Sequence, residues 1–126
     1  MLGALALAAM LSACGATING EADGGAPPAN ESTTVTLRLL TFQPEVLTVP
    51  AGTAVTWANA DGVDHTVTSG TVSPAAGSVT TSTDGRFDSG ILAGGGRYSF
   101  TFSTPGTYAY FCALHPATMR GQITVT

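Results

Sequence analysis

The chain has 126 residues, a formal net charge of −4 at pH 7 and only 10% charged residues, with no lysine among them. This length allows one domain of about 90 residues plus a short appendage, and excludes two independent cores. The chain has no basic patch to neutralise phosphates, so nucleic-acid binding is excluded as a function. Plentiful Thr, Ser, Gly and Val favour short strands and turns over helices.

The chain opens with an apolar run from Leu2 to Leu11 that is too short to cross a bilayer as a helix. It matches the apolar part of a secretory signal, which does not belong to the fold. Leu-Ser-Ala-Cys-Gly then follows and resembles a bacterial lipoprotein signal, in which the cysteine, here Cys14, is lipidated and becomes the first mature residue. The absence of Lys or Arg before the run departs from that pattern. An ordinary secretory signal, or a disulfide between Cys14 and Cys112, are the alternatives.

We therefore expect residues 1–13 to be a signal peptide and residues 14–33 to be a flexible tether that starts at a lipidated Cys14. The tether is polar and aperiodic and contains Pro27-Pro28. Residues 34–126 are expected to fold as one domain. The protein would then be exported and lipid-anchored to the cell membrane, facing the periplasm or the cell exterior.

From residue 34 onward, short β-prone runs alternate with turn signals, and no stretch keeps a helical period. In Tyr98–Phe102 apolar and polar residues alternate, which is typical of a strand with one buried face. The sequence predicts an all-β protein, a Greek-key β-sandwich of about seven or eight strands. The expected strands are Thr34–Leu40, Val46–Val49, Ala54–Asn59, His65–Thr68, Tyr98–Phe102, Tyr108–Cys112 and Gln122–Thr126.

Three further features of this domain are interpreted as structural. Tyr108 follows Pro105-Gly106 and opens a strand, so it is either a tyrosine corner or a core aromatic. Trp57 lies on an expected strand and is assigned to the core. The segment Ser69–Gly85 is rich in Ser, Thr, Gly and Ala and is expected to be a long loop or an irregular sheet edge.

The soft metal donors are few and lie in one constellation. The chain has 2 His, 2 Cys and 3 Met, and those beyond the N-terminal segment are His65, Cys112, His115 and Met119. The last three follow one another as Cys-x2-His-x3-Met, which allows one tight loop to bring them to a point, while His65 comes from another strand end. A thiolate, two imidazoles and a thioether are the donors of a blue-copper site. Zinc, which also accepts His and Cys, and a metal-free immunoglobulin-like sandwich are the alternatives.

In these motifs the chain resembles the cupredoxins, and within them the plastocyanin and amicyanin group. The resemblance covers Thr34 to Thr126 and implies one type 1 copper ion held by His65, Cys112, His115 and Met119. The His115–Met119 loop is intermediate in length between the loops of amicyanin and plastocyanin. The motifs that carry the resemblance are Asp64-His65-Thr66-Val67-Thr68-Ser69, Phe87-Asp88-Ser89-Gly90, Tyr98-Ser99-Phe100-Thr101-Phe102, Pro105-Gly106-Thr107-Tyr108, Tyr110-Phe111-Cys112, His115-Pro116 and Met119-Arg120-Gly121.

The expected function is that of a one-electron carrier, monomeric and not an enzyme. Copper enzymes of this kind need further ligands, typically His-x-His pairs, and the sequence has none. A protein that delivers or stores copper outside the cytoplasm is the alternative function. His115 should be the more exposed histidine, with an apolar patch of Leu114, Pro116 and Ala117 around it on which redox partner proteins dock.

Overall fold

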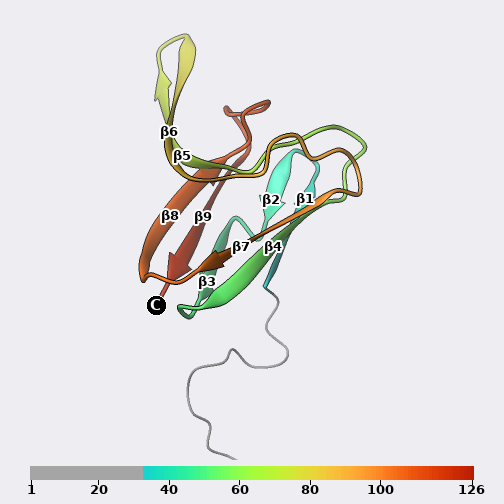
Figure 1. Ribbon diagram of the computed structural model, residues 1–126. Helices are drawn as coiled ribbons and strands as arrows, with labels where there is room; N and C mark the ends of the chain where they lie inside the picture. Colours follow the sequence, from blue (N-terminus) through green and yellow to red (C-terminus); the bar gives the residue numbers. More distant parts are fainter. Residues whose placement is uncertain (1–32) are drawn as a thin grey trace, which may run out of the picture.

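The computed structural model describes residues 33–126, and in this part nine strands form two sheets (Figure 1). The predicted all-β sandwich is therefore confirmed, with nine strands in place of seven or eight. The predicted signal peptide and all but the last residue of the predicted tether lie outside the described residues. Between residues 33 and 126, no helix is long and apolar enough to span a membrane. The strands are β1 (Thr34–Arg38), β2 (Thr41–Gln43), β3 (Val46–Val49), β4 (Thr53–Asn59), β5 (Thr68–Ala75), β6 (Ser78–Asp88), β7 (Arg97–Phe102), β8 (Gly106–Phe111) and β9 (Arg120–Val125).

The two sheets have the orders β2-β1-β4-β7 and β3-β9-β8-β5-β6. Two pairs of neighbours, β1 with β4 and β3 with β9, are parallel, whereas the other pairs are antiparallel. Parallel neighbours need a crossover connection, because a hairpin can join only antiparallel strands, and here each crossover includes a strand of the other sheet. The chain therefore passes repeatedly from one sheet to the other, which closes a core between them.

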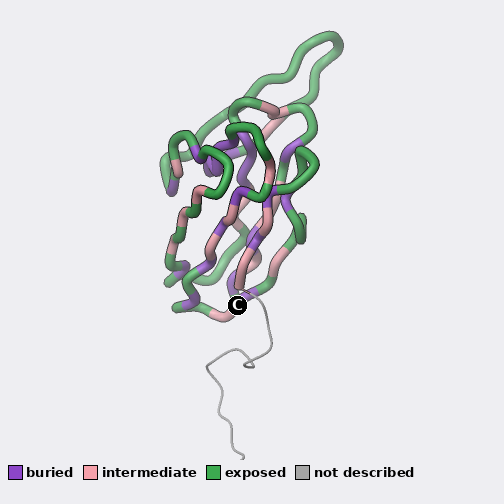
Figure 2. The backbone as a smooth tube through the Cα atoms, turned by 90° about the vertical axis from the view of Figure 1, so that its right-hand side faces the viewer, coloured by how far each residue is buried: buried purple, intermediate pink, exposed green. Residues whose placement is uncertain are grey.

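Alternation of inward-facing and outward-facing side chains along the strands builds this core. In β4, Val55 and Trp57 are fully buried while Ala54 is exposed, because successive side chains point to opposite faces of a sheet. The Trp57 ring packs on Phe87 and Phe102, with centroid distances of 5.7 and 6.2 Å. The assignment of Trp57 to the core is thus confirmed. In Figure 2 the buried positions recur along the strands, and exposed positions dominate the loops.

Four of the connections between strands lie together at one end of the sandwich. The β1–β2 turn, the β4–β5 loop, the β6–β7 loop and the β8–β9 loop all lie at this end, which we call the site end. Figures 1 and 2 place the start of the described chain and the C-terminus at the opposite end. The site end is therefore remote from residue 33 and from the C-terminus.

The structure corrects two of the predicted strands. Leu39 and Leu40 do not continue β1 but form a two-residue turn, with φ of 53° and 58°, before β2. His65 does not begin a strand either. It forms an isolated bridge with Leu92, and β5 starts only at Thr68. In both places the backbone leaves the sheet and becomes part of a loop at the site end.

The segment Ser69–Gly85, expected as a loop or an irregular edge, forms most of the β5–β6 hairpin at the edge of its sheet. The hairpin leaves the sandwich at a register shift between Thr68 and Gly70 and extends beyond the site end (Figure 1). The Ser69 hydroxyl accepts hydrogen bonds from the backbone N–H groups of Arg86 and Phe87 at 3.0 and 2.9 Å, which fixes the base of the hairpin.

Tyr108 is a tyrosine corner, which decides between the two predicted roles. Its hydroxyl donates a hydrogen bond of 2.6 Å to the backbone carbonyl of Thr104, four residues upstream. This contact closes the turn between β7 and β8.

Tyr110, in contrast, is buried without a hydrogen-bond partner for its hydroxyl in the described part of the chain. Burial raises its pKa above the ordinary value, so the neutral side chain stabilises the fold fully below about pH 10, where unfolded tyrosine begins to ionise. We expect the free energy of unfolding to fall as the pH rises above about 10. In Tyr110→Phe the free energy of unfolding should fall less over the same pH range. Urea unfolding between pH 8 and 11 measures this, and an equal loss in both proteins would contradict it.

Candidate metal centre

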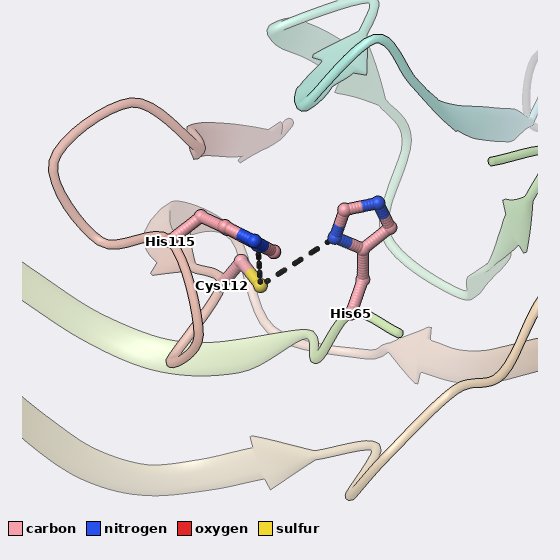
Figure 3. Close-up of side chains that lie close together, drawn as sticks. All are labelled: His65, Cys112 and His115. Atoms are coloured by element: carbon pink, nitrogen blue, oxygen red, sulfur yellow. Dashed lines mark hydrogen bonds between the residues drawn. The ribbon is translucent and has the colours of Figure 1, made fainter. Parts of the chain in front are cut away.

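Three of the four predicted ligands converge at the site end. One potential ligand atom from each of His65, Cys112 and His115 lies within 4.8 Å of the other two. The Nδ1 atoms of His65 and His115 are 3.8 and 3.6 Å from Cys112 Sγ, and both face it in Figure 3. Two imidazole nitrogens and a thiol are thus directed at one point.

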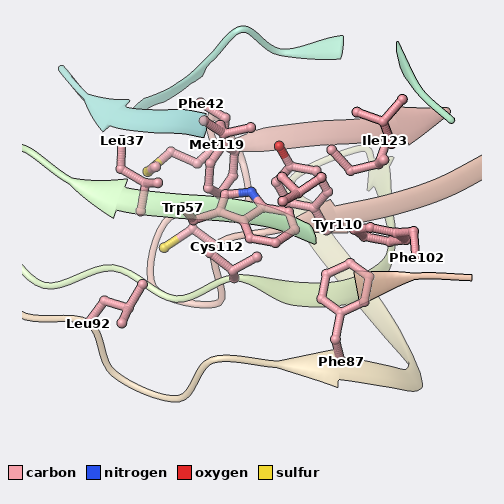
Figure 4. Close-up of a cluster of buried hydrophobic side chains, with 14 of the residues drawn as sticks. Leu37, Phe42, Trp57, Phe87, Leu92, Phe102, Tyr110, Cys112, Met119 and Ile123 are labelled. Atoms are coloured by element: carbon pink, nitrogen blue, oxygen red, sulfur yellow. The ribbon is translucent and has the colours of Figure 1, made fainter. Parts of the chain in front are cut away.

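The β8–β9 loop arranges the fourth residue. The backbone N–H of Cys112 donates to the carbonyl of Met119 at 3.0 Å, and the N–H of Met119 donates to the carbonyl of His115 at 2.9 Å. These bonds fold the loop back on itself so that Met119 is fully buried. In Figure 4 the sulfur atoms of Met119 and Cys112 lie at the same end of the buried cluster.

The site is closed to solvent on all sides but one. His65, Cys112 and Met119 have no exposed surface, whereas His115 is half-buried. The prediction that His115 is the more exposed histidine is confirmed. Within residues 33–126 Cys112 is a buried free thiol, and Cys14, its alternative disulfide partner, lies outside the described residues. The His115 ring is therefore the part of the site that is accessible from solvent.

Thr66 supports the thiol, a role that sequence reasoning missed. Its backbone N–H donates to Cys112 Sγ at 3.3 Å, and its hydroxyl accepts the N–H of Ala113 at 2.7 Å. A hydrogen bond donated to sulfur stabilises the thiolate form that binds metals. The position directly after His65 was the only signal in the sequence that could have indicated this contact.

Asp61 supports His65, a second contact that sequence reasoning missed. Its Oδ2 lies 2.8 Å from His65 Nε2, the ring nitrogen that does not face Cys112. Its two oxygens also accept the N–H groups of Leu39 and Leu40. Burial on its own raises the pKa of Asp61, but the hydrogen bonds outweigh it and hold the pKa below the ordinary value. A carboxylate four residues before a candidate histidine ligand was the available signal.

The donor set fits a copper ion that alternates between two oxidation states. Thiolate and thioether sulfur suit Cu(I), and imidazole suits Cu(II) as well. Because His65 Nε2 is engaged by Asp61, its Nδ1 is left for a metal, in agreement with the direction in which Nδ1 points. A β-sandwich carrying two histidines, a cysteine and a methionine in this order defines a protein of the blue-copper class.

Comparison with known proteins gives the same class. The family described as copper binding proteins of the plastocyanin/azurin family matches residues 29–126. Amicyanin-alpha of Methylorubrum extorquens is 34% identical over 136 aligned positions, covering 97% of this chain and 98% of that protein. Plastocyanin of Scenedesmus fuscus is 37% identical over 87 residues, covering 68% of this chain and 87% of that protein.

Solved structures agree. A purple cupredoxin from Nitrosopumilus maritimus superimposes with a TM-score of 0.60 at 29% identity, covering 76% of this chain and all of that one. An amicyanin variant in its Cu(I) form gives a TM-score of 0.57 at 26% identity, with 79% of this chain and 86% of that one covered. The chain belongs to the plastocyanin/azurin family of copper-binding proteins, the cupredoxins. Its cofactor is one copper ion, and the metal-free immunoglobulin-like alternative is thereby set aside.

Proposed function

We propose that this protein carries single electrons on a type 1 copper ion bound by His65, Cys112, His115 and Met119. In this assignment the two histidines and the cysteine supply the strong equatorial donors, and Met119 supplies the weak axial one. The observation that supports it is the convergence of both Nδ1 atoms on Cys112 Sγ, where His65, Cys112 and Met119 are fully buried. When bound, copper supplies a one-electron couple between Cu(I) and Cu(II).

The protein's own residues limit the movement that accompanies such a couple. Cys112 directly follows β8, His65 is bridged to Leu92, and the β8–β9 loop is closed by its own backbone hydrogen bonds. Ligands held by packed strands and hydrogen bonds keep nearly one geometry in both oxidation states. Little reorganisation then accompanies electron transfer, which suits a carrier.

The test is the visible absorption of the copper-loaded protein followed by a redox titration. We expect an intense thiolate-to-copper charge-transfer band that disappears on reduction and returns fully on oxidation. The alternative function, copper delivery or storage, predicts ready transfer of copper to a chelator in place of reversible cycling. Absence of the intense band would rule out the type 1 site.

We further propose that redox partners dock on the apolar surface around His115. Leu114 is 48% exposed, and Pro116 and Ala117 lie beside it in the same loop. Other exposed aliphatic side chains lie in the remaining loops of the site end. They are Leu39, Leu40, Val63 and Ile91.

Leu114→Glu should slow electron exchange about tenfold or more without altering the copper spectrum, because it places a charge in the contact and like charges facing each other cost several kcal/mol. Self-exchange between the Cu(I) and Cu(II) proteins, followed by NMR line broadening, measures this without knowledge of the partner. Ser103→Glu adds the same charge in the exposed β7–β8 turn, at the opposite end, and should have a much smaller effect. Equal rates in the two variants would contradict docking at Leu114.

We also propose, from the sequence alone, that a lipid on Cys14 tethers this domain to the outer side of a membrane. After export, a short polar linker would connect the copper domain to the membrane and let the domain reorient toward its redox partners. Mass spectrometry of the mature N-terminus tests this. An unmodified residue at the mature N-terminus, or a terminus other than Cys14, would disprove the anchor.

A further inference from the structure

The Nε2 atom of His65, which faces away from Cys112, is close to the carboxylate of Asp61. Asp61 Oδ2 lies 2.8 Å from His65 Nε2, and the two side chains are 13% and 0% exposed. A carboxylate acceptor at this distance favours the tautomer with hydrogen on Nε2. The lone pair is then on Nδ1, the atom that faces Cys112 Sγ.

Asp61 is itself held in place by Asn59. The Asn59 Oδ1 accepts the backbone N–H of Asp61 at 2.9 Å, while its Nδ2 donates to the carbonyls of Val63 and Leu92 at 2.9 and 2.8 Å. Asn59 ends β4 and is only 3% exposed. The carboxylate is therefore directed at His65 by a buried amide on a rigid strand.

The same carboxylate also holds the β1–β2 turn. Asp61 Oδ1 accepts the N–H of Leu39 at 2.8 Å and Oδ2 accepts that of Leu40 at 3.2 Å. Both leucines have left-handed φ angles of 53° and 58°, which side chains with a Cβ rarely adopt. Such backbone persists where surrounding contacts demand it, and here the contacts come from the group that bonds His65.

We propose that Asp61 is a positioning residue of the copper site, which orients His65 for metal binding and lowers the reduction potential of the bound copper. The proposal rests on the proposed function, because it takes His65 as a copper ligand. A carboxylate on the far nitrogen makes an imidazole a stronger donor. Its negative charge also favours Cu(II) over Cu(I), and both effects lower the potential.

The main experiment compares Asp61→Asn with the wild-type protein, both loaded with copper. We expect a higher reduction potential by redox titration and a 10- to 100-fold weaker affinity for Cu(II) in competition with a chelator. The asparagine has the same shape, but its amide nitrogen cannot accept the backbone N–H that one of the Asp61 oxygens binds, so thermal unfolding of the apo-protein checks that the fold persists. A potential and a Cu(II) affinity equal to those of the wild type would overturn the proposal.

Asp64→Asn is the matched control for charge. Asp64 is exposed and adjacent to His65 along the chain, so the variant removes the same charge but leaves the hydrogen bond to Nε2 in place. We expect a smaller change of potential than in Asp61→Asn. Equal changes in the two variants would show that charge alone acts, and would refute a positioning role.

A double variant of the β1–β2 turn separates the effect of Asp61 on His65 from its effect on the turn. Leu39→Asn with Leu40→Gly places the residues that a two-residue turn of this kind prefers, so the turn depends less on Asp61. In this background Asp61→Ala should destabilise the apo-protein less than in the wild type, yet raise the potential as in Asp61→Asn. If the shift of potential disappears there, Asp61 acts only through the turn.

The hydrogen bond between Asp61 and His65 can also be tested without copper. In a two-dimensional NMR spectrum of the apo-protein, His65 should show protonated Nε2 and unprotonated Nδ1, and Asp61→Ala should alter that pattern. An unaltered pattern would refute the Asp61 proposal even if the copper spectrum is as expected. A normal His65 pattern without an intense copper band would instead refute the proposed function.

Discussion

Copper-loaded Cys112→Ser should lack the intense visible band completely. The band requires a thiolate donor, and a serine oxygen is a hard ligand that suits Cu(I) poorly. Loss of affinity for Cu(I) should exceed the 10- to 100-fold that removal of a ligand's outer hydrogen-bond partner costs. Visible absorption and chelator competition measure the two effects.

The apo-protein should tolerate this change. Cys112 Sγ accepts a hydrogen bond from Thr66 N–H at 3.3 Å, and a serine hydroxyl can accept the same bond. Thermal unfolding of the metal-free variant checks that the fold persists. Thr118→Ala, an exposed position in the same loop, should keep the band unchanged. A strong band in Cys112→Ser would mean that copper is bound elsewhere.

The sequence predicted the constellation because its members are rare and their spacing is short. Cys112, His115 and Met119 lie in one loop, so their proximity follows from the chain itself. His65 could be added because the described domain offers no other histidine to complete the set. The sandwich was predictable for a similar reason, since alternation as in Tyr98–Phe102 indicates a strand without knowledge of its partners.

The hydrogen bonds that Asp61 makes to His65 and to the β1–β2 turn were not predictable, because they join residues that are distant along the chain. Asp61 meets His65 only because the β4–β5 loop turns back, and it meets Leu39 only because β1 and β4 run side by side. The β5–β6 hairpin was also missed as regular structure. β6 is exposed except at Phe87, and no residue of β5 beyond Gly70 is buried, so the two strands lack the apolar alternation that marks a half-buried strand.

Trp57→Ala should cost about 3–5 kcal/mol of stability, the range found when large aromatic side chains are removed from cores. Trp57 is fully buried and is in ring contact with four aromatic side chains from β6, β7 and β8, so the cavity cannot collapse easily. Figure 4 shows it in the middle of the buried cluster. For a domain of this size the unfolding temperature should fall by roughly 15 °C or more. Denaturant unfolding of the apo-protein measures the loss.

Trp57→Phe should cost less than half as much. It keeps a ring against Phe87 and Phe102, and it removes an indole N–H that has no hydrogen-bond partner within residues 33–126. Burying an unpaired donor carries a penalty, so its removal offsets part of the lost packing. Ser99→Ala, on the exposed face of β7, loses only an exposed hydrogen bond with Thr56 and should change stability by no more than about 1 kcal/mol. If Trp57→Phe is as damaging as Trp57→Ala, ring packing is not what this residue contributes.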